Sequence, residues 1–88
     1  MKLELRYFAG LREALDCAGE SVDVPASVAT VADLRQWLSA RGGVWEALTT
    51  QKNLRSALDR TMLVLHAEAQ STLHEGAEVA FFPPVTGG

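Results

Sequence analysis

The chain has 88 residues, a formal net charge of −3 at pH 7 and 48% apolar residues, which predicts one small domain with a core of its own. An acidic chain without a basic cluster is a poor candidate for binding nucleic acid, and its apolar runs are far shorter than the ~20 residues of a membrane-spanning helix. A single cysteine, Cys17, excludes an internal disulfide, so we expect a protein of the cytoplasm.

The N-terminal segment alternates between apolar and charged residues. This alternation predicts a half-buried strand over residues 2–8, because successive side chains of a strand point to opposite faces. The inward-facing residues are Leu3, Leu5 and Tyr7. Apolar residues then recur at helical spacing over residues 11–18, and alternation returns over residues 21–24. We therefore expect a strand, a short helix and a second strand.

The clearest helix signal follows these elements. Thr30 is the expected N-cap, and Asp33 lies where its carboxylate can bond back to the N–H of the cap, as in a capping box. The glycine pair Gly42-Gly43 predicts the end of this helix, and residues 44–48 predict a further short helical turn. The expected buried face of the main helix consists of Val31, Leu34, Trp37 and Leu38.

The C-terminal half contains short strand signals separated by turns. Residues 54–58 and 78–82 are predicted strands, and turns are expected at residues 59–60 and 73–76. Residues 61–65 are rich in strand-forming residues and are apolar after Thr61, which predicts either a buried strand or a helical turn.

One main helix with four to five short strands predicts an α+β roll, in which a mixed sheet wraps over the helix and the first and last strands are central. We expect this domain to span residues 1–82. Residues 83–88 are expected to leave it as an extended tail, since two prolines fix φ and cannot continue a strand ladder. The final residues, Gly87 and Gly88, lack a Cβ and suit a channel too narrow for side chains.

Three segments carry a family resemblance, namely residues 7–13, 73–79 and above all 78–88, whose sequence is EVAFFPPVTGG. The last of these closely resembles the end of the small subunit of molybdopterin synthase, and the other two look like that family's first strand-to-helix junction and its last turn. The resemblance implies a ubiquitin-like β-grasp fold, which agrees with the roll predicted above. It also implies a sulfur carrier in molybdenum cofactor biosynthesis.

The chemistry implied by the resemblance takes place at the terminal carboxylate of Gly88. An enzyme similar to the ubiquitin-activating class uses ATP to adenylate this group, and a sulfur donor converts the adenylate to a thiocarboxylate. The large catalytic subunit then uses that sulfur to turn cyclic pyranopterin monophosphate into molybdopterin. On this reading the chain is a non-catalytic carrier subunit with no permanently bound cofactor.

The resemblance also implies roles for residues that meet partners. Gly87 permits threading, Phe82 packs into a groove of the partner, and Arg12 meets an acidic partner surface. The full set of expected partner-binding residues is Arg12, Phe82, Pro83, Pro84, Val85, Thr86 and Gly87. Phe81 and Phe82 are adjacent on a strand, so one is expected in the core and the other outside, and the family match favours Phe82 as the outer residue.

Other functions remain open at this point. The carrier could serve another product, such as thiamine, thiolated tRNA or an amino acid, or Gly88 could be joined to a lysine as in a ubiquitin-like modifier. A plain interaction module with an idle tail is the fourth reading. Cys17 has acidic neighbours, which argues against a sulfur nucleophile, and His66 and His74 lack the further ligands expected of a metal site.

Overall fold

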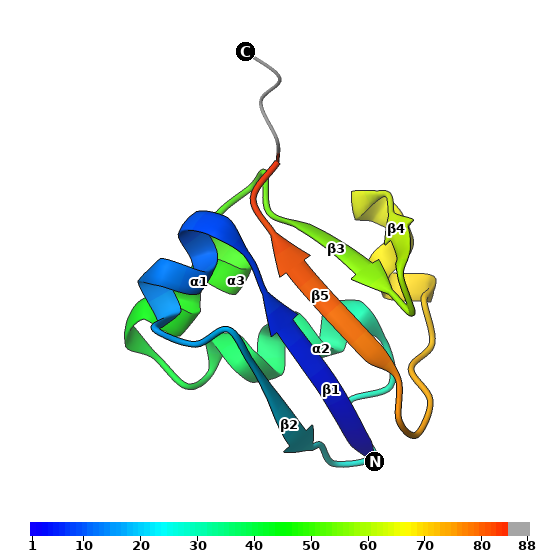
Figure 1. The fold of residues 1–88 in the computed structure, drawn as a ribbon. Helices are drawn as coiled ribbons and strands as arrows, with labels where there is room; N and C mark the ends of the chain where they lie inside the picture. Colours follow the sequence, from blue (N-terminus) through cyan, green and yellow to red (C-terminus); the bar gives the residue numbers. More distant parts are fainter. Residues whose placement is uncertain (85–88) are drawn as a thin grey trace.

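The structure, a computed structural model, describes residues 1–84. Strands and short helices alternate along this part of the chain in a mixed α+β arrangement (Figure 1). The elements are β1 (Lys2–Tyr7), α1 (Ala9–Leu15), β2 (Gly19–Asp23), α2 (Val31–Ser39), the 3-10 helix η1 (Gly43–Glu46), α3 (Ala47–Thr50), β3 (Arg55–Leu58), β4 (Thr61–Leu63), the 3-10 helix η2 (Leu65–Gln70) and β5 (Glu78–Phe82). Across the described residues, no helix is both long enough and apolar enough to span a bilayer.

The five strands form one mixed sheet in the order β2-β1-β5-β3-β4. β1 and β5 run parallel, whereas the other neighbouring pairs are antiparallel. The first and last strands therefore lie side by side in the middle of the sheet, as predicted, and α2 crosses one face of it (Figure 1). This places the end of the last strand next to the end of the first.

Local sequence signals explain why the main helix begins at Val31. The Thr30 hydroxyl accepts a hydrogen bond from the N–H of Asp33, and the Asp33 carboxylate accepts one from the N–H of Thr30, both at 3.2 Å. This is the predicted capping box, which satisfies donors that a helix start otherwise leaves open. Hydrogen bonds from the N–H groups of Ala29 and Thr30 also hold the pKa of Asp33 below its ordinary value.

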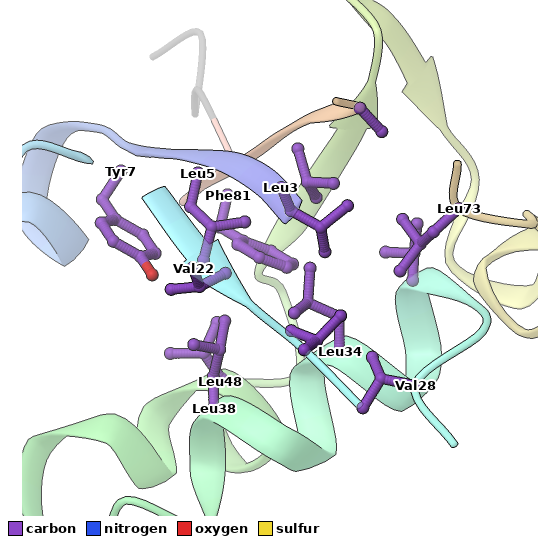
Figure 2. Packing of buried hydrophobic residues seen from close by; sticks show 14 of the residues in the cluster. Leu3, Leu5, Tyr7, Val22, Val28, Leu34, Leu38, Leu48, Leu73 and Phe81 are labelled. Atoms are coloured by element: carbon purple, nitrogen blue, oxygen red, sulfur yellow. The ribbon is translucent and has the colours of Figure 1, made fainter. Parts of the chain in front are cut away.

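The hydrophobic core lies between the inner face of the sheet and α2 (Figure 2). The alternation of β1 is reproduced in its burial, since every second side chain is buried. Burying each large apolar side chain contributes about 1.5–3 kcal/mol, so this layer is the main stabilising element. Its labelled members are Leu3, Leu5, Tyr7, Val22, Val28, Leu34, Leu38, Leu48, Leu73 and Phe81.

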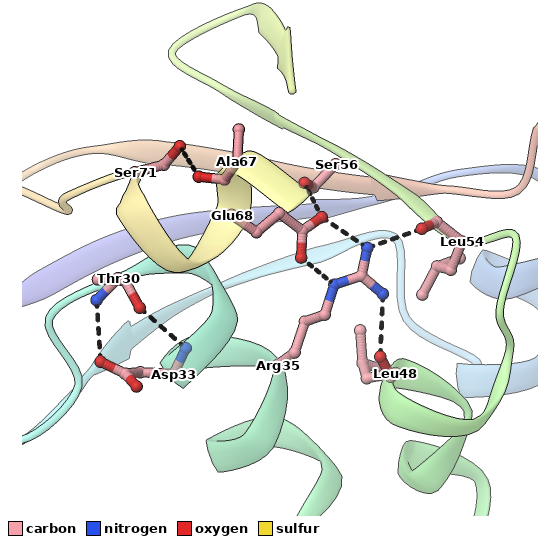
Figure 3. Close-up of polar contacts among 9 residues, drawn as sticks. All are labelled: Thr30, Asp33, Arg35, Leu48, Leu54, Ser56, Ala67, Glu68 and Ser71. Carbon is pink, nitrogen blue, oxygen red and sulfur yellow. Dashed lines mark hydrogen bonds and ion pairs between the residues drawn. The ribbon is translucent and has the colours of Figure 1, made fainter. Parts of the chain in front are cut away.

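One buried ion pair joins the helices to β3 (Figure 3). Arg35 of α2 donates to both carboxylate oxygens of Glu68 in η2, at 2.6 Å from Nε and 2.8 Å from Nη2. The same guanidinium donates to the carbonyl oxygens of Leu48 at 3.0 Å and Leu54 at 2.7 Å. The Ser56 hydroxyl completes the network by donating to the carboxylate. Both charges are therefore fully hydrogen-bonded, as buried charges require.

Two segments differ from the sequence-based expectation. Residues 61–65 were expected to form a buried strand or a helical turn. Thr61–Leu63 is a strand, but the side chain of Met62 is exposed, because it lies opposite Ala57 on the face of the edge strand β4 that points away from the core. The first helix was expected to reach residue 18 but ends at Leu15. Asp16 follows it in the left-handed conformation, with φ of 52°, which terminates the helix.

Candidate functional site

The end of β5 is anchored in the core just before the tail begins. Phe81 is fully buried, and its ring stacks on that of Tyr7 with centroids 6.4 Å apart. The guanidinium of Arg35 lies 5.4 Å from the centre of the Phe81 ring, on the helix side. The last strand therefore has little freedom at the point where the chain leaves the sheet.

Phe82 points away from the core, as the alternation of the strand predicts. It lies opposite Arg55 of β3 in the register of the two strands and is partly exposed. The two residues share an open hollow of about 390 Å³ with Met62 and Pro84. An apolar surface with an arginine at its border thus surrounds the point where residue 83 leaves β5.

The other predicted site residues fall into two groups. Pro83 and Pro84 directly follow β5 and are partly exposed, and Arg12 is exposed on α1. α1 starts beside the end of β5, where the N–H of Phe8 donates to the carbonyl oxygen of Phe81 at 3.2 Å. Four predicted site residues lie outside the described residues, namely Val85, Thr86, Gly87 and Gly88.

A second hollow lies on the outer face of the sheet. Its floor is formed by Ala57 and Ala80, which pair across β3 and β5 and are too small to fill the space above them. Phe8, 46% exposed, stands at one border, although the sequence reasoning did not select it. The alternation of β1 could have shown this, because an inward Tyr7 places the next residue outside. The hollow measures about 250 Å³ and is lined by Arg6, Phe8, Ala57, Arg60, Glu78 and Ala80.

Around this hollow the outer face carries more positive than negative side chains, although the chain is acidic. Glu78 accepts a hydrogen bond from Nε of Arg6 at 2.6 Å and lies 3.4 Å from Nε of Arg60. The bond from Arg6, and to a smaller extent that from Arg60, holds the pKa of Glu78 below its ordinary value, so the group stays ionised and paired. With Arg55, three guanidinium groups lie in this part of the face against two carboxylates, those of Glu78 and of Asp59, which accepts a hydrogen bond from the N–H of Glu78 at 3.0 Å. An acidic partner surface would complement it.

Two polar side chains away from the outer face of the sheet, those of Cys17 and Tyr7, have partners within the domain. Across residues 1–84, no three His, Cys, Asp or Glu side chains are grouped in a way that would hold a metal ion. Cys17 is partly buried, and its Sγ lies 3.5 Å from the carbonyl oxygen of Gly19. The hydroxyl of Tyr7 donates to Glu20 at 2.9 Å, and burial together with this bond raises the pKa of Tyr7. The Tyr7 hydroxyl therefore has a structural role.

Comparison with known proteins identifies the family. The profile of the ThiS family matches residues 5–88. The molybdopterin synthase sulfur carrier subunit of Escherichia coli is 34% identical over 86 residues, which cover 98% of this chain and 99% of that protein. The chain belongs to the ThiS family. The resemblance identified from three short segments thus extends over almost the whole chain.

Solved structures confirm the ubiquitin-like β-grasp fold of this ThiS-family chain. The crystal structure of SAMP1 from Haloferax volcanii matches it with a TM-score of 0.74 and 26% identity, and 100% of each chain is covered. A chain of the complex of subunits 1 and 2 of the molybdopterin-converting factor from Helicobacter pylori matches with a TM-score of 0.67 and 22% identity, again over 100% of both chains. The fold is therefore shared by proteins whose names indicate different roles.

Proposed function

We propose that this ThiS-family chain is the sulfur carrier subunit of a molybdopterin synthase. The observation that carries the proposal is the 34% identity, over nearly the full length of both chains, to the Escherichia coli protein of that name. The geometry at the end of β5 supports it, because a rigid strand passes directly into a proline arm that ends in two glycines. Such an arm suits delivery of a terminal group into the active site of another protein.

The proposed chemistry has two steps at Gly88 before sulfur is transferred. An α-carboxyl group has a pKa of ~3.3–3.7, so it is an anion at neutral pH and a poor electrophile. Its oxygen attacks the α-phosphorus of ATP, pyrophosphate leaves, and the product is an acyl-adenylate. Sulfur from a donor then attacks the acyl carbon and AMP leaves, which gives the thiocarboxylate. The thiocarboxylate sulfur then bonds to a carbon of cyclic pyranopterin monophosphate, and water cleaves the bond between this sulfur and the acyl carbon, which returns the carboxylate.

The proposal assigns the catalytic groups to the partners. The adenylating enzyme supplies the groups that activate ATP, and the large subunit of the synthase supplies those that act on the pterin. The outer face of the sheet is the docking surface, with Phe82 as its apolar centre and Arg6, Arg55 and Arg60 as its basic border. Arg12 on the neighbouring α1 extends the basic border.

The proposal is tested by the intact mass of the protein after incubation with ATP, an adenylating enzyme for this family and a sulfur source. We expect one oxygen to be replaced by sulfur, in the C-terminal peptide. The matched control is the chain without Gly87 and Gly88, which should unfold at the same temperature and keep its mass. An unchanged mass of the intact chain, with an enzyme shown to act on the Escherichia coli carrier, would overturn the proposal.

A second assay separates molybdopterin from other products. An Escherichia coli strain that lacks its own molybdopterin synthase sulfur carrier subunit should regain molybdoenzyme activity when it receives this chain together with its cognate large subunit. The variant without the two glycines should not restore activity. Thiocarboxylate formation without rescue would point to thiamine, tRNA thiolation or an amino acid instead.

A ubiquitin-like modifier is the second candidate function. It is favoured by the likeness to SAMP1, which is named a small archaeal modifier protein in a second crystal structure at 25% identity and a TM-score of 0.71. In that case the activated carbonyl of Gly88 would form an isopeptide bond with a lysine amine, and AMP would leave. Mass spectrometry of cell extracts for peptides carrying the C-terminal residues on lysine distinguishes the two functions.

A further inference from the structure

The exposed apolar side chains of the described residues are concentrated at one edge of the sheet. Of the five large hydrophobic residues that are exposed there, three lie within four positions. They are Met62 at 68%, Val64 at 55% and Leu65 at 45% exposed. These residues form or directly follow β4, the edge strand next to β3. An uncovered apolar edge strand is a template for pairing with another chain.

The backbone of β4 is also oriented for pairing. Asp59 donates its N–H to the carbonyl oxygen of Glu78 in β5 at 2.8 Å, so the N–H of the preceding Leu58 faces the opposite way, toward β4. Leu58 lies opposite Thr61 across the two-residue turn, and this pair therefore exchanges the hydrogen bonds of the hairpin. The N–H and C=O of Met62, one residue further on, point away from β3 to the open edge.

This edge adjoins the point where the tail leaves the domain. β4 runs antiparallel to β3, so its C-terminal end lies beside the start of β3, where Arg55 pairs with Phe82. Met62 lines the same hollow of about 390 Å³ as Phe82 and Pro84. A protein that receives the tail therefore also reaches the edge of β4.

The surrounding charges limit what can pair there. Arg55 and Arg60 flank the strand on β3 and in the turn, and the Arg60 side chain is 89% exposed, with its Nε 3.4 Å from Glu78. The acidic neighbour in the turn, Asp59, is itself held by His74, so the two arginines favour an acidic segment over a basic one. The complementary segment has apolar residues opposite Met62 and Val64 and a carboxylate near Arg60.

We propose that the protein that receives the tail adds an extended strand with acidic flanks to the outer edge of β4, so that the sheet continues into the partner. This inference rests on the proposed function, and the receiving protein it names is the large subunit of the synthase. The added strand would bond to the N–H and C=O of Met62 and cover the side chains of Val64 and Leu65. Strand addition would fix the orientation of the domain on the partner and so direct the tail toward the partner's active site.

The substitution Met62→Pro tests strand addition directly. Proline removes one outward-pointing N–H, and edge strands tolerate it because that group does not bond within the sheet. The matched control is Met62→Val, which keeps the N–H and an apolar strand-forming side chain. Binding to the large subunit is measured by titration calorimetry. We expect Met62→Pro to weaken binding about tenfold or more, since it removes one hydrogen bond to the partner and the contacts next to it. Met62→Val should bind within about threefold of the original chain.

A measurement on the unmodified protein keeps the test independent of how the proline variant folds. In the isotope-labelled chain, the amide of Met62 should exchange rapidly with solvent when free and slowly when the large subunit is bound. Rapid exchange in the complex, or equal affinity of the folded Met62→Pro variant, would overturn strand addition while leaving the carrier role intact. Failure of the unmodified chain to bind the large subunit would instead count against the proposed function.

A second copy of the chain is the competing occupant of the edge. Sedimentation of the free protein, which gives its oligomeric state, distinguishes pairing with a second copy from pairing with the large subunit. A monomer with an unprotected Met62 amide supports the proposal. A dimer that Met62→Pro dissociates would overturn it, because the edge would already be covered by another copy.

Discussion

Arg35 and Glu68 are 33 residues apart in the chain, yet they form a two-point ion pair with oxygen–nitrogen distances of 2.6 and 2.8 Å. Their side chains are 11% and 6% exposed. The pair connects α2 with η2, and the remaining bonds of Arg35 connect it to the carbonyl groups that precede β3. Since β3 pairs with β5, this network supports the strand from which the tail leaves.

Removing one partner of this ion pair should be strongly destabilising. Glu68→Gln leaves the Arg35 charge buried without a counter-charge, and we expect a loss of about 3–5 kcal/mol in the free energy of unfolding, measured by urea titration. Glu46→Gln, at an exposed position, is the control and should change stability by less than about 0.5 kcal/mol. The double variant Arg35→Met with Glu68→Leu should recover most of the loss. A single variant as stable as the original chain would contradict the structural role.

The contact between Asp59 and His74 predicts a pH dependence of stability. Nε2 of His74 lies 2.5 Å from Oδ2 of Asp59, and this bond, with a contact to the Glu75 carbonyl, raises the pKa of His74. A raised pKa in the folded state means that the contribution of His74 is full below the unfolded value of about 6.5 and is lost as the pH rises through the folded value. His74→Gln should therefore lower the melting temperature more at about pH 6 than at about pH 9.

The stabilising contribution of the contact between Asp59 and His74 is also lost at low pH. The hydrogen bond from the Glu78 N–H and that of His74 lower the pKa of Asp59, so its contribution is present above the unfolded value of about 3.9 and is lost as the pH falls through the lower folded value. In an Asp59→Asn background, the effect of His74→Gln should change less with pH, because only the contact with the Glu75 carbonyl then remains. An undiminished pH dependence in that background would show that another group is responsible.

Alanine substitutions at Gly19 and Gly10 should have opposite effects on stability. A Cβ at position 19 would lie 2.7 Å from the carbonyl oxygen of Leu5, whereas a Cβ at position 10 would meet no heavy atom within 4 Å. Gly19→Ala should destabilise the protein by about 1–3 kcal/mol, because backbone must move to admit the methyl group. Gly10→Ala, in α1, should stabilise it by up to about 1 kcal/mol. Denaturant titration of both variants tests the contrast, and equal effects would refute it.

Alanine substitution of Phe81 should lower folding stability, whereas alanine substitution of Phe82 should weaken binding of the large subunit. Phe82→Ala is expected to weaken binding of the large subunit with a small loss of stability, since Phe82 lies on the outer face in the hollow beside the tail. Phe81→Ala should cost about 3–5 kcal/mol of folding stability, because that ring is fully buried. Calorimetric binding and thermal unfolding of both variants are the measurements. A large drop in melting temperature for Phe82→Ala with binding preserved would place it in the core.

The parts of the fold that were predictable depend on neighbours along the chain. The capping box of Thr30 and Asp33 is complete within four residues, and the burial of β1 follows from its alternation. The end of the chain was informative for a different reason, since prolines forbid continuation of β5 and glycines lack side chains. The outward position of Phe82 followed from strand alternation, and the prediction that it binds a partner came from the family resemblance.

The parts that were not predictable depend on residues distant in sequence. Glu68 lies in a stretch without clear periodicity, and its burial is explained by Arg35, which a local pattern does not show. The apolar residues 61–65 predicted a buried strand or a helical turn, but the exposure of Met62 depends on the position of β4 at the edge of the sheet and on the face on which Met62 lies. The small floor of the outer hollow likewise arises from the pairing of Ala57 with Ala80 across two strands.

The parallel pairing of β1 with β5 has a consequence for how the protein is made. Of the described strands, β5 is the last to leave the ribosome, and it separates β1 from β3 in the finished sheet. A nascent chain that still holds residues 78–82 inside the ribosome cannot close this sheet, so the sheet forms only after β5 has emerged. The surface around Phe8 and Phe82 then forms only on chains that include β5, and shorter products do not present it to a partner.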